Sequence, residues 1–395
     1  MKIDPEIRLA NFMDSCLEYL DKKGNLLTAP PLYNPKKFAA KVVHFSPCEN
    51  DFIYSNIFAE WNIEIFSYLE GGRKFNIINL VLSLYNVYKK LKKEGINIIR
   101  GRLPYLGSFL GCLAGKCLRI PSIVSLGGNN RIPQERENKY NYGSKWISYT
   151  MEKIVLYLCD QIIAPNYYTK DYVSSIIGEK RANAKVRIIP WTINKIDHDK
   201  LLGRDYFEHL GLKSTGPYIL LVGFLNKYKF SDIMFKVVEE VTTSISSEVQ
   251  FVFCGDGPLR DYGKASLKRF TNVLFIGWQP NEIIQSLINH ARIILVPMSG
   301  FVLLEAASLG KPVIASNIEW HSELIKDGVT GFLVDPTSIN KWVQKIKLLL
   351  GNSEVSERVG HNLQVVFNFE YDKESLIDRE IALYHSLINS RVKRN

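Results

Sequence analysis

The sequence has no apolar run long enough to cross a membrane. Its longest apolar stretches, such as residues 154–158 and 292–297, fall far short of the ~20 residues that a membrane helix needs. The opening residues, from Met1 to Glu6, also lack the charged run, apolar core and small-residue cleavage site of a secretion signal. These two absences predict a cytoplasmic protein.

Cysteine is scarce as well, and its spacing matches no recognisable site. None of the six cysteines stands at zinc-ligand or redox spacing from another. This pattern predicts buried thiols in a reducing compartment, with neither a bound metal nor a disulfide. The six residues are Cys16, Cys48, Cys112, Cys117, Cys159 and Cys254.

Acidic residues are outnumbered by basic ones only in the first half of the chain. Residues 1–195 carry 28 lysines and arginines against 17 acids, whereas residues 196–395 carry 22 against 23. A basic half indicates nucleic acid, an anionic membrane or a phosphorylated ligand as partner, or simply a solvated surface. Because no nucleic-acid recognition motif accompanies the charge, no nucleic-acid partner is expected.

Part of this positive charge gathers at the end of one expected helix, residues 77–93. Its apolar residues recur near helical spacing, and Tyr85 and Tyr88 precede four lysines, where cations suit the helix dipole. Such an end predicts peripheral contact with an anionic membrane on its inner face, or a solvated helix end with no partner. The four lysines are Lys89, Lys90, Lys92 and Lys93.

The length of 395 residues suits two domains, and the C-terminal half is the easier to interpret. Continuous apolar runs, each ending in glycine, proline or serine, alternate with helix-length stretches, as in a parallel doubly wound sheet. The ligands of such sheets bind beyond the carboxyl ends of the strands. The expected strands are 218–222, 249–254, 273–276, 293–296 and 312–315.

The N-terminal half shows the same α/β pattern less cleanly, and a polar stretch at 190–217 is the best candidate for a linker. The expected strands are 41–45, 96–99, 122–126, 161–164 and 186–189.

A candidate diphosphate site follows the strand that ends at Pro297. A loop carrying Ser299 and Gly300 leads into a helix that begins near Phe301. The amino end of a helix offers free N–H groups and a partial positive charge, which suit a diphosphate. Glu305 lies about one turn into that helix, where its carboxylate could accept hydrogen bonds from both hydroxyls of a ribose.

The segment from 296 to 336 resembles the nucleotide-binding signature of family-4 retaining glycosyltransferases of the GT-B fold. In that signature a glycine and a Leu-Glu-Ala helix precede Gly-x-Pro-Val-Ile-Ala and a later Asp-Gly-x-x-Gly-x-Leu-Val. The matching residues are Gly300, Phe301, 304–306, Gly310, 312–315, Glu323, Gly328 and 331–334.

The resemblance implies two Rossmann-like doubly wound domains that face each other across a cleft. Residues 1–195 would bind the acceptor, residues 196–370 the sugar nucleotide, and residues 371–395 would form a helix packing back on the first domain. It implies transfer of a sugar from a UDP- or GDP-sugar to a saccharide or lipid-linked glycan, with retention. Neither a metal nor another cofactor is implied.

The resemblance also suggests site residues. Lys229, with Arg131 and His321, would stabilise the reacting groups. The strand end at 127–130 would meet the acceptor or the donor sugar, through Gly127, Gly128, Asn129 and Asn130. The donor nucleotide sugar would contact Gly223, Lys229, Gly277, Trp278, Ser299, Gly300, Phe301, Val302 and Glu305.

Three departures from the family pattern keep alternatives open. The glutamate expected before Glu305 is missing: either the loop is about two residues shorter and Ser299 takes its place, or its role is absent. Phe224 replaces an arginine, and Gly127 replaces a histidine. Lys227 or Arg131 would have to supply the lost positive charge. A sugar-nucleotide epimerase on the same fold and a catalytically impaired binding subunit therefore remain alternatives. A phosphorylase is disfavoured, because no lysine-borne pyridoxal site is recognisable.

Overall fold

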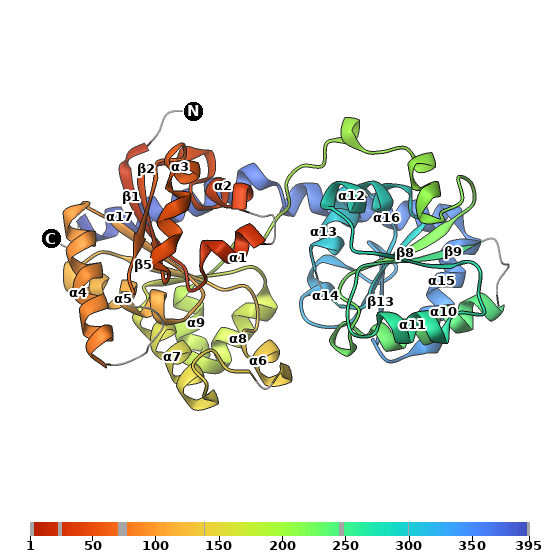
Figure 1. Ribbon diagram of the computed structural model, residues 1–395, viewed down its shortest axis with the longest axis horizontal. Helices are drawn as coiled ribbons and strands as arrows, with labels where there is room; N and C mark the ends of the chain where they lie inside the picture. Colours follow the sequence, from red (N-terminus) through yellow and green to blue (C-terminus); the bar gives the residue numbers. More distant parts are fainter. Residues whose placement is uncertain are drawn as a thin grey trace. The chain divides into compact units, whose positions relative to one another are not determined.

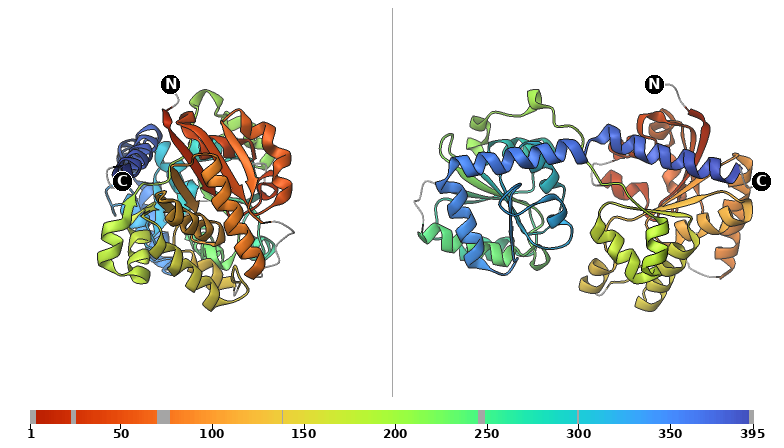
Figure 2. Two further views of the ribbon diagram at one scale, coloured as in Figure 1. Left: turned by 90° about the vertical axis from the view of Figure 1, so that its left-hand side faces the viewer. Right: turned by 180° about the vertical axis from the view of Figure 1, so that it is seen from behind.

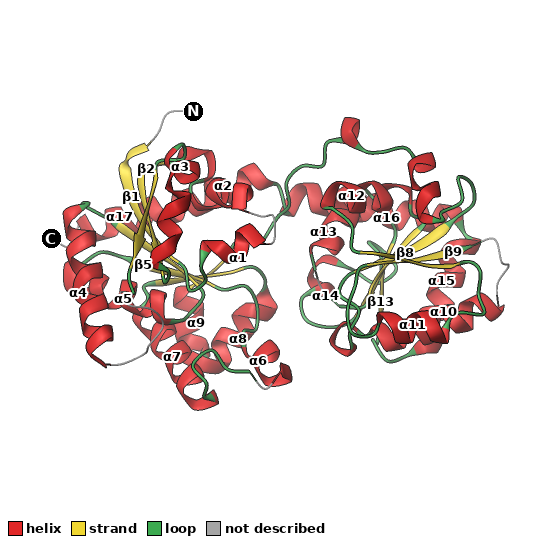
Figure 3. Cartoon of the chain, in the orientation of Figure 1, coloured by secondary structure: helices red, strands yellow, loops and turns green. Residues whose placement is uncertain are grey.

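The chain forms two compact units, one of Met1–Pro190 with Glu374–Asn395 and one of Trp191–Lys373. The computed structural model describes residues 4–22, 26–69, 77–137, 139–244, 249–298 and 300–392. Each unit is a parallel sheet with helices on both faces (Figures 1 and 3). Both units therefore have the doubly wound α/β architecture that the sequence predicts.

The N-terminal unit is built on a seven-stranded sheet with the order β3-β2-β1-β4-β5-β6-β7. Chain order reverses beside β1, which pairs in parallel with both β2 and β4. The strands are β1 (Asp4–Phe12), β2 (Ala39–Ser46), β3 (Ile63–Ser67), β4 (Ile98–Arg102), β5 (Ser122–Ser125), β6 (Gln161–Ala164) and β7 (Val186–Ile188).

Helices cover both faces of this sheet because alternate strand residues point to opposite layers. Ile7 and Leu9 belong to one buried cluster, and Ala10 and Phe12 belong to another. The helices are α1 (Leu17–Lys22), α2 (Ala29–Tyr33), α3 (Ser55–Ala59), α4 (Ile77–Lys93), α5 (Leu106–Leu118), α6 (Arg131–Glu137), α7 (Lys145–Leu158), α8 (Tyr167–Ile177), α9 (Glu179–Lys185) and α17 (Lys373–Val392).

The last helix, α17, lies along the N-terminal unit (Figure 2). Glu380 forms an ion pair with the nearly buried Arg100 of β4, whose Nη1 also donates to the hydroxyl of Tyr384 at 3.0 Å. Lys36 pairs with Asp378 at 2.9 Å. The N-terminal unit thus depends on a helix about 180 residues further along the chain for the partner of a buried charge.

The sequence did not predict β1, the central strand, because polar residues interrupt its apolar pattern. The structure pairs these residues: Arg8 Nε donates to the carbonyl of Glu94 at 2.7 Å, and Asn11 Nδ2 lies 3.0 Å from His44 Nδ1. The strand expected at 96–99 was placed two residues early, since β4 includes two arginines. Both arginines bond to residues from distant segments of the chain, which the local sequence does not predict.

The C-terminal unit has a six-stranded sheet with the order β10-β9-β8-β11-β12-β13. Its first five strands coincide with the expected ones to within a residue or two, whereas the short β13 was not predicted. The strands are β8 (Tyr218–Val222), β9 (Gln250–Cys254), β10 (Val273–Gly277), β11 (Ile293–Val296), β12 (Val313–Ser316) and β13 (Phe332–Val334).

Two helical layers also enclose this second sheet. Along β8, Tyr218 and Leu220 face one buried cluster, and Ile219 and Leu221 face the other. The helices are α10 (Ser231–Ser244), α11 (Arg260–Ser266), α12 (Asn281–His290), α13 (Phe301–Ser308), α14 (His321–Leu324), α15 (Ile339–Gly351) and α16 (Ser353–Glu370).

The stretch at 190–217 is not a linker, contrary to the sequence-based expectation. Ile196, Phe207 and Leu212 are buried in the core of the C-terminal unit, and most of the stretch belongs to that unit. The stretch is mostly polar, and its three buried apolar residues are too far apart in the sequence to form a recognisable pattern.

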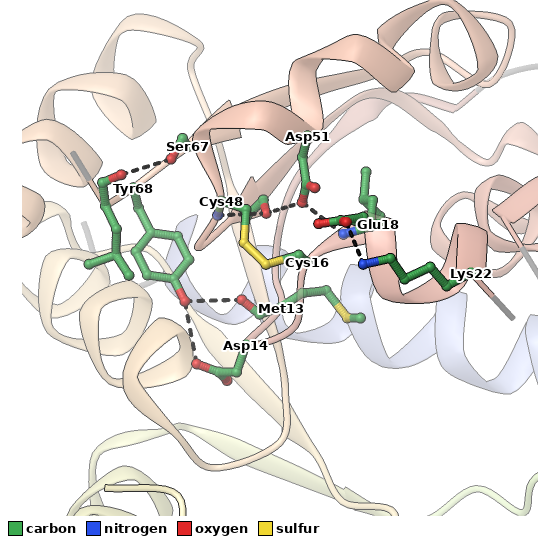
Figure 4. Close-up of a disulfide and its surroundings, with 12 residues drawn as sticks. Met13, Asp14, Cys16, Glu18, Lys22, Cys48, Asp51, Ser67 and Tyr68 are labelled. Atoms are coloured by element: carbon green, nitrogen blue, oxygen red, sulfur yellow. Dashed lines mark hydrogen bonds and ion pairs between the residues drawn. A yellow bond between two sulfur atoms is a disulfide. The ribbon is translucent and has the colours of Figure 1, made fainter. Parts of the chain in front are cut away.

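The expectation for the cysteines is wrong at three positions. Cys16 and Cys48 form a disulfide with their Cα atoms 5.5 Å apart (Figure 4), and Cys117 is exposed. The disulfide residues follow the adjacent parallel strands β1 and β2, whose ends are paired through Phe12 and Phe45, so a separation of 32 residues becomes a contact. The remaining three cysteines are buried thiols, as predicted.

In the part of the chain that the structure describes, every helix is too short or too polar to span a bilayer.

Candidate functional site

The first candidate site lies at the carboxyl edge of the C-terminal sheet, where three loops meet closely. The N–H of Gly223, after β8, donates to the carbonyl of Cys254 at 3.0 Å, and that of Gly255 donates to Gly277 at 2.7 Å. A Cβ atom on Gly255 would lie 1.9 Å from the carbonyl oxygen of Gly223. Glycine is therefore required here for the loops after β8 and β9 to approach each other.

Lys229 lies on a tight turn after β8. Its N–H donates to the side chain of Asn226 at 2.8 Å, and the next residue, Phe230, has a left-handed backbone with φ of 55°. Burial lowers the pKa of Lys229, and the carboxylate of Glu319 acts in the opposite direction. Phe224 and Lys227, in the same loop, are exposed.

His321 approaches the same edge from the first residue of α14. Its Nδ1 donates to the carbonyl of Ser316 at 2.7 Å, and its buried Nε2 has no hydrogen-bond partner among the described residues. Burial lowers the pKa of His321 to about 4; the bond to Ser316 opposes this shift, and the charge of Lys229 adds to it. The ring is therefore neutral at pH 7, and the buried Nε2 carries a lone pair.

The helix that the sequence assigned to the diphosphate, α13, begins at Phe301 with Gly300 as its N-cap. Phe301 is 53% exposed, and its ring stacks on Trp191 at 6.1 Å between centroids. Val302 is half-buried. Ser299 lies outside the described residues, so its assignment stays a prediction.

Glu305 lies on the buried side of α13 and is only 5% exposed. Burial raises the pKa of Glu305, although hydrogen bonds from Gln285 and Asn281 of α12 act to lower it. Trp278, after β10, is 72% exposed. A buried carboxylate with amide partners, about one helical turn from the exposed ring of Phe301, suits recognition of a polar ligand that carries a flat base.

The residues expected to contact the acceptor lie after β5 in the N-terminal unit, where they form a turn. The side-chain oxygen of Asn129 accepts from the N–H of Arg131 at 3.1 Å, while Gly128 takes a positive φ of 145°. Gly127 precedes this turn, and Asn130 Nδ2 is buried without a partner among the described residues.

Arg131 already has a partner. Its Nε lies 2.7 Å from the buried carboxylate of Glu152, and its guanidinium lies 4.1 Å from the ring centre of Tyr149. Its charge is thus compensated within the N-terminal unit, and its predicted contact with the diphosphate stays a prediction.

A cavity of about 730 Å³ in the N-terminal unit was not predicted from the sequence. It could have been indicated by Asp14, an acid two residues after β1, but β1 itself was not predicted. Lining residues come from the segments after β1, β2 and β3, from the end of β4, and from α4 and α7. They include Asp14, Tyr68, Asn79, Arg102, Tyr105 and Tyr142.

Comparison with known proteins finds a family match within the C-terminal unit. Residues 204–365 match the family model described as glycosyl transferases group 1. An uncharacterized glycosyltransferase of Methanocaldococcus jannaschii is 23% identical over 299 residues, covering 73% of this chain and 76% of that protein. The UDP-Gal:alpha-D-GlcNAc-diphosphoundecaprenol alpha-1,3-galactosyltransferase of Escherichia coli is 24% identical over 291 residues, covering 69% and 71%.

Solved structures extend the likeness to the whole fold. HepE of Anabaena, crystallised with UDP, superimposes with a TM-score of 0.74 at 15% identity, covering 96% of this chain and 100% of that chain. The similarity therefore spans both units rather than the C-terminal one alone.

Proposed function

We propose that the chain is a glycosyltransferase that uses a nucleoside diphosphate sugar. It has the GT-B fold, and residues 204–365 match the group 1 glycosyl transferases. The sugar is a hexose, transferred to a saccharide or lipid-linked glycan with retention and without a metal. The observation that carries the proposal is that Lys229, Glu305 and His321 follow the carboxyl ends of three neighbouring strands of one doubly wound sheet, β8, β11 and β12. HepE binds UDP, and the E. coli relative acts on a lipid-linked sugar, which supports these ligand classes.

In the proposed reaction, the bond between the anomeric carbon and the diphosphate breaks, and the acceptor oxygen bonds to that carbon on the same face. The acceptor proton passes to the departing diphosphate, so no protein nucleophile is needed. Lys229 and the N–H groups at the start of α13 stabilise the charge that grows on the leaving group. Nε2 of His321 accepts a hydrogen bond from a hydroxyl of the donor sugar.

One feature supports a metal-independent reaction. Lys229 and the amino end of α13 supply positive potential where a divalent ion would otherwise act.

Incubating the protein with a panel of UDP- and GDP-hexoses and soluble glycosides tests this proposal. We expect transfer, or slow hydrolysis when no acceptor is present, at a rate that EDTA changes by less than about twofold. NMR of the product should show the anomeric configuration of the donor. An isomerised sugar would instead identify an epimerase, and tight binding without turnover a binding subunit; loss of activity in EDTA would refute metal independence.

We also propose that α4 rests on an anionic membrane surface. Ile78, Val81, Leu82 and Tyr85 are all at least 50% exposed and recur at helical spacing, so they form one apolar stripe. The exposed lysines 89, 92 and 93 follow on the same helix. Lys90, counted with them from the sequence, is instead paired with Glu64 and Glu94. An apolar stripe continued by lysines fits the interface of an anionic bilayer.

Sedimentation with phosphatidylglycerol-containing vesicles should show binding that weakens as salt rises, because about 1 kcal/mol per lysine comes from the surface potential. Changing the three exposed lysines of α4 to glutamate should abolish it. A matched variant with Lys180, Lys268 and Lys347 changed to glutamate carries the same net charge and should still bind. Equal loss in both variants, or binding indifferent to anionic lipid, would rule out this surface.

A further inference from the structure

The cavity of the N-terminal unit lies where a doubly wound sheet binds its ligands. Its walls include residues just beyond β1, β2 and β3 and the last residue of β4, Arg102. Since β1 lies between β2 and β4, these ends surround the point at which chain order reverses in the sheet. Ligands of open α/β sheets bind at this point, and about 730 Å³ is a usual volume for a small-molecule site.

The two oxygens of Asp14 are held very differently. Oδ1 accepts from the N–H of Gly107 at 2.7 Å, and the hydroxyl of Tyr68 points to it at 3.4 Å (Figure 4). Oδ2 is buried and has no hydrogen-bond partner within the described part of the chain. Capping the amino end of α5 explains the first oxygen but leaves the second unexplained. A buried acceptor without a partner is costly unless a ligand supplies the donor.

The rest of the wall indicates the kind of ligand. Three tyrosines, Tyr68, Tyr105 and Tyr142, and two asparagines, Asn79 and Asn141, line the cavity together with aliphatic side chains. Aromatic faces suit the C–H faces of a pyranose ring, while amides and a carboxylate suit its hydroxyls.

We propose that this cavity binds a sugar residue of the acceptor, with Oδ2 of Asp14 accepting a hydrogen bond from one of its hydroxyls. The inference rests on the proposed function and adds the acceptor subsite to it. It places that subsite at the ends of β1 to β4 rather than after β5. Free glycosides and lipid-linked sugars share the recognised chemistry, so the test includes both.

The charge of Asp14 gives this contact a pH dependence. Burial raises the pKa of Asp14 to about 7, against the lowering effects of Gly107 and Tyr68. The groups that line the cavity with Asp14 keep their protonation state between pH 6 and 8. The pKa of Tyr105 is raised to about 12, and those of Tyr68 and Tyr142 are raised too. The pKa of Arg102 is lowered only to about 10. The carboxylate that accepts a hydroxyl therefore forms as pH rises through about 7.

Saturation-transfer NMR and titration without any donor measure acceptor binding by itself. The probes are p-nitrophenyl hexosides and the same hexoses linked to farnesyl diphosphate. Wild-type affinity should fall by up to about tenfold between pH 8 and pH 6. Asp14→Asn keeps an oxygen for Gly107 but should bind about tenfold or more weakly at pH 8, with no pH dependence. Asp171→Asn, on the exposed face of α8, should behave as wild type.

Ile147→Trp provides an independent test, because Ile147 lines the cavity but is 39% exposed, so the larger ring can be accommodated without disturbing the core. It should weaken glycoside binding at least tenfold while UDP still raises the melting temperature. Glycosides that bind both variants as tightly as wild type, or that fail to bind wild type, would overturn the subsite. Failure of the proposed function would instead appear as absent UDP and GDP-sugar binding in wild type, whatever the glycosides do.

Discussion

Replacing Lys229 with alanine is expected to lower the rate of sugar transfer by about 10²-fold or more, the usual effect of losing one preorganised charge at a leaving group. The loss should appear mainly in kcat, because the negative charge on the diphosphate is larger in the transition state than in the bound sugar nucleotide. Melting temperature should stay within a few degrees, since burial lowers the pKa of Lys229 and its charge does not stabilise the unliganded fold.

The matched control is Lys236→Ala, on the exposed face of α10, which should leave transfer unchanged. Lys229→Arg should recover part of the rate. Because the pKa of Lys229 is lowered, the rate should begin to fall at a lower pH on the alkaline side than an ordinary lysine would give. A loss of less than tenfold in the alanine variant would remove Lys229 from the mechanism.

Glu305→Gln should weaken binding of the nucleoside diphosphate by about 10- to 100-fold, because a charge-assisted hydrogen bond to a ribose hydroxyl is worth about 1.5–3 kcal/mol. In a thermal-shift titration, nucleotide at 100 times its dissociation constant stabilises the wild type by about 2.7 kcal/mol. A variant with thirtyfold weaker binding would gain only about 0.9 kcal/mol at the same concentration. Since burial raises the pKa of Glu305, wild-type affinity should decline on acidification at a higher pH than for an exposed glutamate.

Glu282→Gln, at the exposed start of α12, removes the same charge nearby and should bind nucleotide as the wild type does. Glu305 also bonds to Asn281 and Gln285, so a purely structural role is the competing explanation. That explanation predicts a change in melting temperature with nucleotide affinity within about threefold of wild type.

The C-terminal sheet could be predicted from the sequence because its strands are continuous apolar runs with clear ends. Buried on both faces, β8 and β11 need no information beyond their own residues. The start of α13 at Phe301 followed from a glycine and a proline close by.

The centre of the N-terminal sheet could not be predicted in the same way. Arg8 and Asn11 obscure β1, and each is accommodated by a partner from another segment of the chain. The cavity beside Asp14 is assembled from residues up to 134 positions apart, from Met13 to Ile147, which no local pattern connects. The disulfide was missed for a related reason, since the pairing of β1 with β2 brings its cysteines together.

The return of α17 to the N-terminal unit has a consequence for biosynthesis. A ribosome adding about 5–20 residues per second needs roughly ten to forty seconds to make the segment between Pro190 and Glu374. During that interval Arg100 lacks Glu380, and the surface that α17 will cover stays open to solvent and chaperones. The unit that leaves the ribosome first is therefore the last to complete its folding.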